Sequence, residues 1–202
     1  IKSFFFHSRE AWNNARNSLV APHLVKILTA ASQDLGYKPS QWNVDDCIKA
    51  YDWKAASFVT VFADVPEALE LFLHHGLKTG IITNAFHPMA IRDVELSQYG
   101  LLPYFPECRF SAADWGYLKP HPSIFNHALA CLGVLPHEAV FVGDNATADI
   151  GGAQGVGMKA IMRVFEKRRS FAGGLIVPDA EVFSFSEIPA ILDAWYPGWR
   201  GE

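Results

Sequence analysis

The stretch AVFVGDNATADIGGAQGVG, residues 139–157, joins an apolar run to two carboxylates and is the most informative part of the chain. Its first four residues predict a buried strand, and Gly143 lets the backbone turn tightly where that strand ends. Asp144 follows at once, and Asp149 comes about one helical turn later, near the start of a helix. Carboxylate oxygens at such a strand end are ligands that Mg²⁺ prefers. Taken singly, either aspartate is as well explained by a helix cap or a turn.

Short apolar runs alternate with segments of helical period through the rest of the chain. Residues 65–76 and 121–133 both have proline near the predicted start and glycine at the end, which is typical of helices. Strands that alternate with helices predict an α/β fold with a mostly parallel sheet covered by helices. The predicted strands are SFVTVF at 57–62, KTGIITN at 78–84, CRFSA at 108–112, AVFVGD at 139–144, KAIMRV at 159–164 and AEVFSF at 180–185.

The first quarter of the chain has a different pattern, without a strand signal. Residues 7–36 carry apolar side chains at helical spacing, interrupted by Pro22 and ended by Gly36. A second, shorter helical pattern occupies residues 44–56. We therefore expect a helical segment at 1–57 and an α/β core at 58–202.

Composition narrows the class of protein. The chain has 202 residues, half of them hydrophobic, which predicts one domain with a sizeable core and at most a modest insertion. A net charge of -4 argues against a nucleic-acid surface, and no apolar window is long enough for a membrane span. Three cysteines without C-x-x-C spacing favour reduced core thiols, and with no export signal we expect a cytoplasmic protein.

Ligands of parallel sheets bind beyond the carboxyl ends of the strands, so the residues that follow each strand matter most. Thr83 and Asn84 end one strand and could offer a hydroxyl and amides to an anion, although such a pair is more often only a turn. Lys119 precedes Pro120 in a stiff loop, where a lone lysine is usually solvated. With Asp144, these residues place a hydroxyl, a cation and a carboxylate along one rim.

This order of groups resembles the haloacid dehalogenase (HAD) superfamily of hydrolases. IITN at 81–84 is similar to its second motif, LKP at 118–120 to its third, and VGDNATAD at 142–149 to its fourth. The resemblance runs from about Val65 to Val164 and includes the tail at 178–192. It implies a Rossmann-like core with helices on both faces and a small helical cap. It also implies a Mg²⁺-dependent phosphatase that acts on a small phosphorylated metabolite through an aspartyl-phosphate.

The resemblance also implies a role for each matching residue. Thr83 would hydrogen-bond the transferring phosphoryl group, and Asn84 would help bind substrate. Lys119 would neutralise charge on the nucleophile and the phosphoryl oxygens. Asp144 would bind Mg²⁺, and Asp149 would support Lys119 or a metal-bound water. The metal-free dehalogenases of the superfamily typically lack the Gly-Asp of the fourth motif, so Asp144 favours a phosphatase.

The first motif of the superfamily, a strand that ends D-x-D and supplies the nucleophile and the general acid/base, is absent from these residues. None of the eleven aspartates forms such a pair, and Asp64 is a lone acid after a predicted strand. One hypothesis is that the strand lies upstream of Ile1, in which case these residues alone are inactive. The alternative is a non-catalytic protein of the same fold that binds phosphate or a partner. A receiver-like or nucleotide-binding domain is a third hypothesis, and substrate and oligomeric state stay open.

Overall fold

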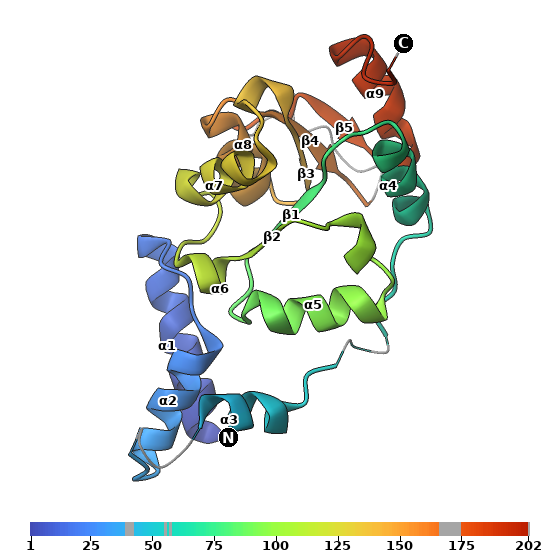
Figure 1. Cartoon of the computed structure of the whole chain (residues 1–202). Helices are drawn as coiled ribbons and strands as arrows, with labels where there is room; N and C mark the ends of the chain where they lie inside the picture. Colours follow the sequence, from blue (N-terminus) through green and yellow to red (C-terminus); the bar gives the residue numbers. More distant parts are fainter. Residues whose placement is uncertain (39–42, 55, 57, 166–174, 202) are drawn as a thin grey trace.

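The computed structural model describes residues 1–38, 43–54, 56, 58–165 and 175–201. The chain begins with three helices, α1 (Lys2–Ser18), α2 (Leu24–Asp34) and α3 (Val44–Tyr51), as the pattern of the first quarter predicts. Figure 1 shows that this helical segment projects from one end of the part that contains the strands. No helix among the described residues is long and apolar enough to cross a membrane.

The remaining elements alternate between helix and strand. Of the six predicted strands, five are present within the expected ranges. The elements are α4 (Asp64–His74), β1 (Gly80–Thr83), α5 (Met89–Gln98), β2 (Cys108–Ser111), α6 (Ala112–Trp115), α7 (Pro122–Leu132), β3 (Val140–Gly143), α8 (Gly152–Gly155), β4 (Lys159–Arg163), β5 (Ala180–Val182) and α9 (Ile188–Trp195).

The prediction of a strand at 57–62 is wrong, because the described residues 58–62 form none. Phe58 is 88% exposed, so the apolar alternation of this segment does not mark a buried face. The Phe62 ring packs against Phe165 and lies over the guanidinium of Arg163. Side-chain contacts at the end of β4 thus hold this segment, and no strand in the described part of the chain pairs with it.

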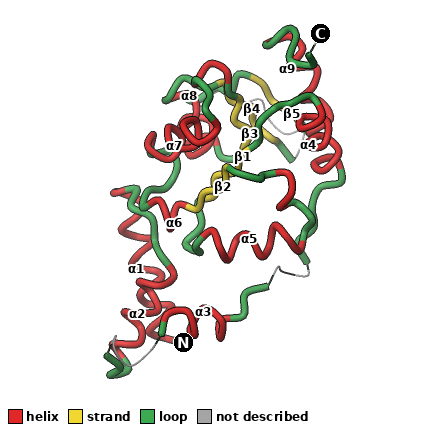
Figure 2. Tube along the Cα trace, in the orientation of Figure 1, coloured by secondary structure: helices red, strands yellow, loops and turns green. Residues whose placement is uncertain are grey.

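Every strand pairing is parallel, as predicted. β1 pairs with β2, and β3, β4 and β5 form a second sheet in that order. Among the described residues, β1 and β3 each have a ladder on one side only. Figure 2 shows the two sheets side by side with helices around them.

Helices cover both faces of the larger sheet. Ala160 and Met162 of β4 pack in the same cluster as Phe125 of α7. Ile161, between them in sequence, packs in a second cluster with Leu69 of α4 and with α9. Successive side chains of a strand point to opposite faces. An uninterrupted apolar run in β4 is therefore what a sheet buried on both sides requires.

The loop between α1 and α2 is attached to the part of the chain that contains the strands. The backbone N–H of Ala21 donates to the carbonyl of Gly116, and that of Leu118 donates to the carbonyl of Leu19, both at 2.8 Å. The N–H of Leu24, at the start of α2, donates to the carbonyl of Phe86 at 2.8 Å. The helical segment therefore holds both the loop that follows β1 and the loop that precedes Lys119.

A second contact between the two parts is built around His87, which follows β1 and is buried. Its Nε2 lies 3.2 Å from the hydroxyl of Tyr51, and its ring centroid lies 4.2 Å from that of Trp53. Desolvation, together with the nearby charge of Arg92, lowers the pKa of His87 to about 4. The folded protein therefore holds this imidazole neutral at pH values where an unfolded chain would protonate it.

We expect the free energy of unfolding to fall as the pH drops from about 6.5 towards 4, because only the unfolded state then gains a proton at His87. In His87→Gln this part of the pH dependence, up to about 3 kcal/mol, is lost. Urea denaturation at a series of pH values measures it. His74→Gln, at an exposed histidine of α4, is the matched control and keeps the wild-type slope. Equal slopes in all three proteins would contradict the prediction.

Candidate active site

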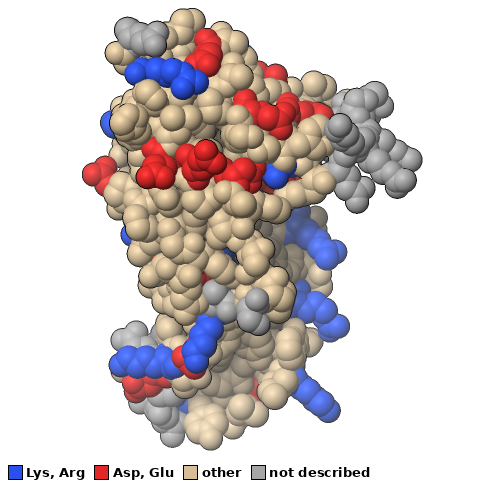
Figure 3. Space-filling view, turned by 90° about the vertical axis from the view of Figure 1, so that its right-hand side faces the viewer, with Lys and Arg blue, Asp and Glu red and all other residues tan. Residues whose placement is uncertain are grey.

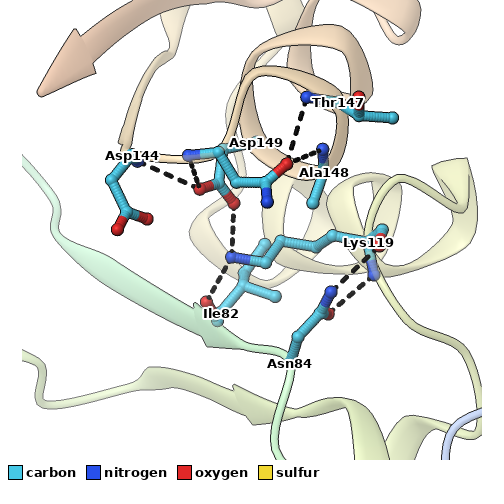
Figure 4. A network of polar contacts seen from close by, with 8 residues as sticks. Ile82, Asn84, Lys119, Asp144, Thr147, Ala148 and Asp149 are labelled. Carbon is cyan, nitrogen blue, oxygen red and sulfur yellow. Dashed lines mark hydrogen bonds and ion pairs between the residues drawn. The ribbon is translucent and has the colours of Figure 1, made fainter. Parts of the chain in front are cut away.

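Lys119 lies between the carboxyl ends of β1 and β3. Its ammonium donates a hydrogen bond to the carbonyl of Ile82 at 3.0 Å and forms an ion pair with Asp149 at 2.7 Å. Figure 4 shows the lysine side chain extending from its loop to the Ile82 carbonyl in β1 and to Asp149 in the turn after β3. The side chains of Lys119 and Asp149 are only 10% and 6% exposed. Lys119 is therefore buried and paired, whereas a lone lysine in a loop is usually solvated.

The turn after β3 positions Asp149. Asn145 begins a π-helical turn, Ala146–Gly151, and its side chain accepts hydrogen bonds from the N–H groups of Thr147 and Ala148 at 3.1 and 2.8 Å. The Asp149 oxygen that does not face Lys119 accepts from the N–H groups of Asp144 and Asn145 at 3.1 and 3.0 Å. One carboxylate oxygen is thus hydrogen-bonded, and the other is held by the ion pair with Lys119 and accepts no hydrogen bond from the described residues. This geometry favours Asp149 as the support of Lys119 over a metal ligand.

Asp144 has the opposite environment. Its side chain is exposed at the end of β3, and in Figure 4 its carboxylate points away from the lysine. No described residue forms a hydrogen bond or ion pair with that carboxylate. The described residues contain no group of three His, Cys, Asp or Glu able to hold a metal ion. Mg²⁺ commonly binds through one or two carboxylates and keeps several waters, so Asp144 fits as one ligand of such an ion.

Asn84 holds the backbone of Lys119. Its side-chain oxygen accepts from the Lys119 N–H at 2.7 Å, and its side-chain nitrogen donates to the Lys119 carbonyl at 2.9 Å. The amide group predicted to bind substrate is therefore occupied by the lysine loop. Thr83, at the end of β1, is half-buried, and its hydroxyl has no partner among the described residues.

Sequence reasoning missed Ser111, which ends β2 and is fully buried. Its hydroxyl donates to the carbonyl of His87 at 2.6 Å and accepts from the N–H of Ala113. Ser111 therefore shapes the loop that follows Asn84. Its place at a strand end, like that of Thr83, is the signal that would have identified it.

Gly143 is required because Asp149 occupies the space of a side chain. A Cβ at position 143 would lie 2.4 to 2.5 Å from the Asp149 side chain. We expect Gly143→Ala to lower the free energy of unfolding by about 2 kcal/mol or more, because the carboxylate must move from its amide donors. Gly155→Ala is the matched control, since nothing lies within 4 Å of its Cβ, and we expect little change. Denaturant titration of both variants decides between these outcomes.

Asp149→Asn should destabilise the protein by roughly 3 kcal/mol, because it leaves the buried Lys119 ammonium without its counter-charge. Asp144→Asn changes an exposed carboxylate without a described partner, and we expect a change within about 0.5 kcal/mol. Thermal and urea unfolding of the 202-residue chain measure both. Equal effects of the two variants would show that the ion pair does not contribute to stability as we infer.

Figure 3 shows the distribution of charge on the face at the right of Figure 1. Acidic side chains gather in its upper half, and lysines and arginines stand mainly along the lower half. The basic groups on this face do not form one continuous surface.

Known proteins resemble this chain in sequence and in structure. It is 31% identical to glyceraldehyde 3-phosphate phosphatase of Pyrococcus furiosus over 79% of the chain and 64% of that protein. It is 30% identical to pyrophosphatase PpaX of Bacillus pumilus over 87% of the chain and 77% of that protein. The crystal structure of 2-haloacid dehalogenase from Pseudomonas syringae superposes with a TM-score of 0.71 at 28% identity, covering 96% of this chain and 81% of that one.

The chain thus spans slightly less than two thirds of the Pyrococcus phosphatase. Residues 13–157 match the family described as haloacid dehalogenase-like hydrolase, and this match includes the second, third and fourth motifs. This match shows the family, and the parallel sheets and similar solved structures agree with it. The chain belongs to the haloacid dehalogenase-like hydrolase family.

Proposed function

We propose that these residues form most of a Mg²⁺-dependent phosphatase for a small phosphorylated metabolite. The buried ammonium of Lys119 carries this proposal. A lysine has three N–H donors, and among the described residues one donates to the Ile82 carbonyl while the Asp149 carboxylate pairs with the ammonium as an ion. The ammonium reaches the carboxyl end of β1 from its loop, and there the hydroxyl of Thr83 has no partner among the described residues. Together they suit an anion with several oxygens, as a phosphoryl group has.

The relatives support a phosphatase over other hydrolases of the family. Two of them are named as phosphatases of phosphorylated or pyrophosphate compounds. A dehalogenase has a similar structure, so the fold alone does not separate the two activities. Asp144 is the residue that favours the phosphatase, because an exposed carboxylate beside the anion site suits a metal ion that a phosphate would share.

We infer that the nucleophile is supplied by an extended segment outside these 202 residues, which pairs between β1 and β3. Each of these strands lacks a ladder on one side among the described residues. Lys119 joins their carboxyl ends by side-chain contacts. A parallel strand ending D-x-D in that position would bring its aspartates next to Lys119, Thr83 and Asp144.

Each residue then has a distinct part in phosphoryl transfer. Bound Mg²⁺ would neutralise charge on the phosphoryl oxygens, with Asp144 as one of its ligands. Lys119 brings the nucleophilic carboxylate and the anionic phosphoryl group together by offsetting their repulsion, and Thr83 orients the phosphoryl group. Asp149 and Asn84 are positioning residues, because they fix the ammonium and the backbone of Lys119. Residues 1–57 would act as a cap that excludes water from the site.

The 202-residue chain itself should hydrolyse no phosphate monoester, because it lacks the nucleophile. The gene product that includes the preceding residues should hydrolyse small phosphate monoesters only with Mg²⁺. A release assay for inorganic phosphate, with and without EDTA, measures both. The preceding sequence is read from the native protein by intact mass and N-terminal sequencing. A native protein without a D-x-D strand would instead support the non-catalytic alternative, a phosphate- or partner-binding protein.

In the complete protein, Lys119→Ala should lower kcat at least roughly 100-fold, because charge in a dry site is then left unneutralised. Asp144→Asn should abolish Mg²⁺-dependent turnover while the protein stays folded. Lys78→Ala is the matched control: its ammonium donates to Leu132 outside the site, and we expect unchanged kinetics. A loss of less than about twofold for Lys119→Ala would remove this lysine from the mechanism.

A further inference from the structure

Two cysteines from distant parts of the sequence face each other at the end of β2 opposite the candidate active site. Cys108 is the first residue of β2, is fully buried, and has its Sγ 3.8 Å from the carbonyl of Ala128 in α7. Cys131, in the last turn of α7, is exposed, and its Sγ lies 3.6 Å from the carbonyl of Glu107. Each thiol therefore contacts the segment that carries the other.

The two thiols differ in environment. Burial, together with the smaller effect of the adjacent Cys131, raises the pKa of Cys108 to about 12, which favours the protonated thiol. Its Sγ would lie 2.6 Å from a Cβ at Gly80, the residue that pairs with it in β1, so it occupies space that only a glycine leaves free. Cys131 is the sulfur that solvent reaches. The prediction that all three cysteines are core thiols is therefore wrong, since only Cys108 is buried.

We propose that Cys108 and Cys131 form an oxidation-sensitive pair that hydrogen peroxide converts into an intramolecular disulfide. The exposed Cys131 reacts first: its thiolate attacks one peroxide oxygen, the O–O bond breaks, and a sulfenic acid and water result. The Cys108 sulfur then attacks the sulfur of that sulfenic acid. An S–S bond forms, the S–O bond breaks, and hydroxide leaves with the Cys108 proton as water. In total, two thiols and one peroxide give one disulfide and two waters.

The cross-link would close the chain from residue 108 to residue 131, the segment that carries Lys119. It would join the amino-terminal end of β2 to the last turn of α7, and Lys119 lies near the opposite, carboxyl end of β2. We expect the disulfide to stabilise this segment without blocking the site, because a cross-link mainly limits the unfolded chain. The inference does not depend on the proposed phosphatase activity.

The test treats the 202-residue chain with a small excess of hydrogen peroxide, blocks remaining thiols with iodoacetamide, and maps peptides under non-reducing conditions. We expect a monomer that has lost two hydrogen atoms, with the peptides of Cys108 and Cys131 linked and Cys47 alkylated. The Tm of the oxidised protein should rise by roughly 5–10 °C and return after reduction with dithiothreitol.

Two variants make the result specific. Cys131→Ser removes the exposed thiol and should give neither the linked peptide nor the change in Tm. Cys47→Ser is the matched control and should behave like the wild type. The proposal is overturned if Cys131 accumulates as a sulfinic acid while Cys108 stays reduced, if Cys131 links to Cys47, or if only disulfide-linked dimers form. Mapping of the wild-type protein decides the question even if Cys131→Ser folds poorly.

Discussion

The buried ion pair between Lys119 and Asp149 is the interaction on which the geometry of the site depends. Removing two charges from water costs several kcal/mol for each ion unless hydrogen bonds compensate. Here the ammonium also donates to the Ile82 carbonyl, and the carboxylate also accepts two backbone N–H groups. Each of these contacts restricts the orientation of one of the two side chains. Together they hold the Lys119 ammonium in one position, between the carboxyl ends of β1 and β3.

Several residues around the ion pair position Lys119 and Asp149. Gly143 leaves room for the Asp149 side chain, and Asn145 starts the π-helical turn that aims it. Asn84 holds both the N–H and the carbonyl of Lys119, so the loop cannot turn without breaking two hydrogen bonds. π-helical turns are rare in proteins, but those that occur are often at functional sites. The position of this turn beside Lys119 agrees with that tendency. The ammonium that we propose meets a reacting anion is thus held in place by contacts within the protein.

The helical segment contributes to the same site through its attachment. Backbone hydrogen bonds from the loop between α1 and α2 reach both the loop after β1 and the loop before Lys119. His87, neutral and buried, adds a contact from Tyr51 and Trp53. The sheet edges of β1 and β3, joined here by one lysine side chain, mark the place where the proposed nucleophile strand would complete the enzyme.

The sequence alone determined the fold class, five of the strands and the set of charged groups at the strand ends. These follow from local physics, because periodicity reports which face is buried, and glycine and proline mark the ends of elements. Contacts between distant residues could not be read in the same way. The apolar alternation at 58–62 predicted a strand, but none of the strands that the structure describes pairs with it. Asn84 had the chemistry of a ligand, and only the fold revealed that Lys119 occupies it. The pairing of Cys108 with Cys131 likewise depends on where α7 packs against β2. The tertiary structure decided these points because each depends on which partner a side chain meets.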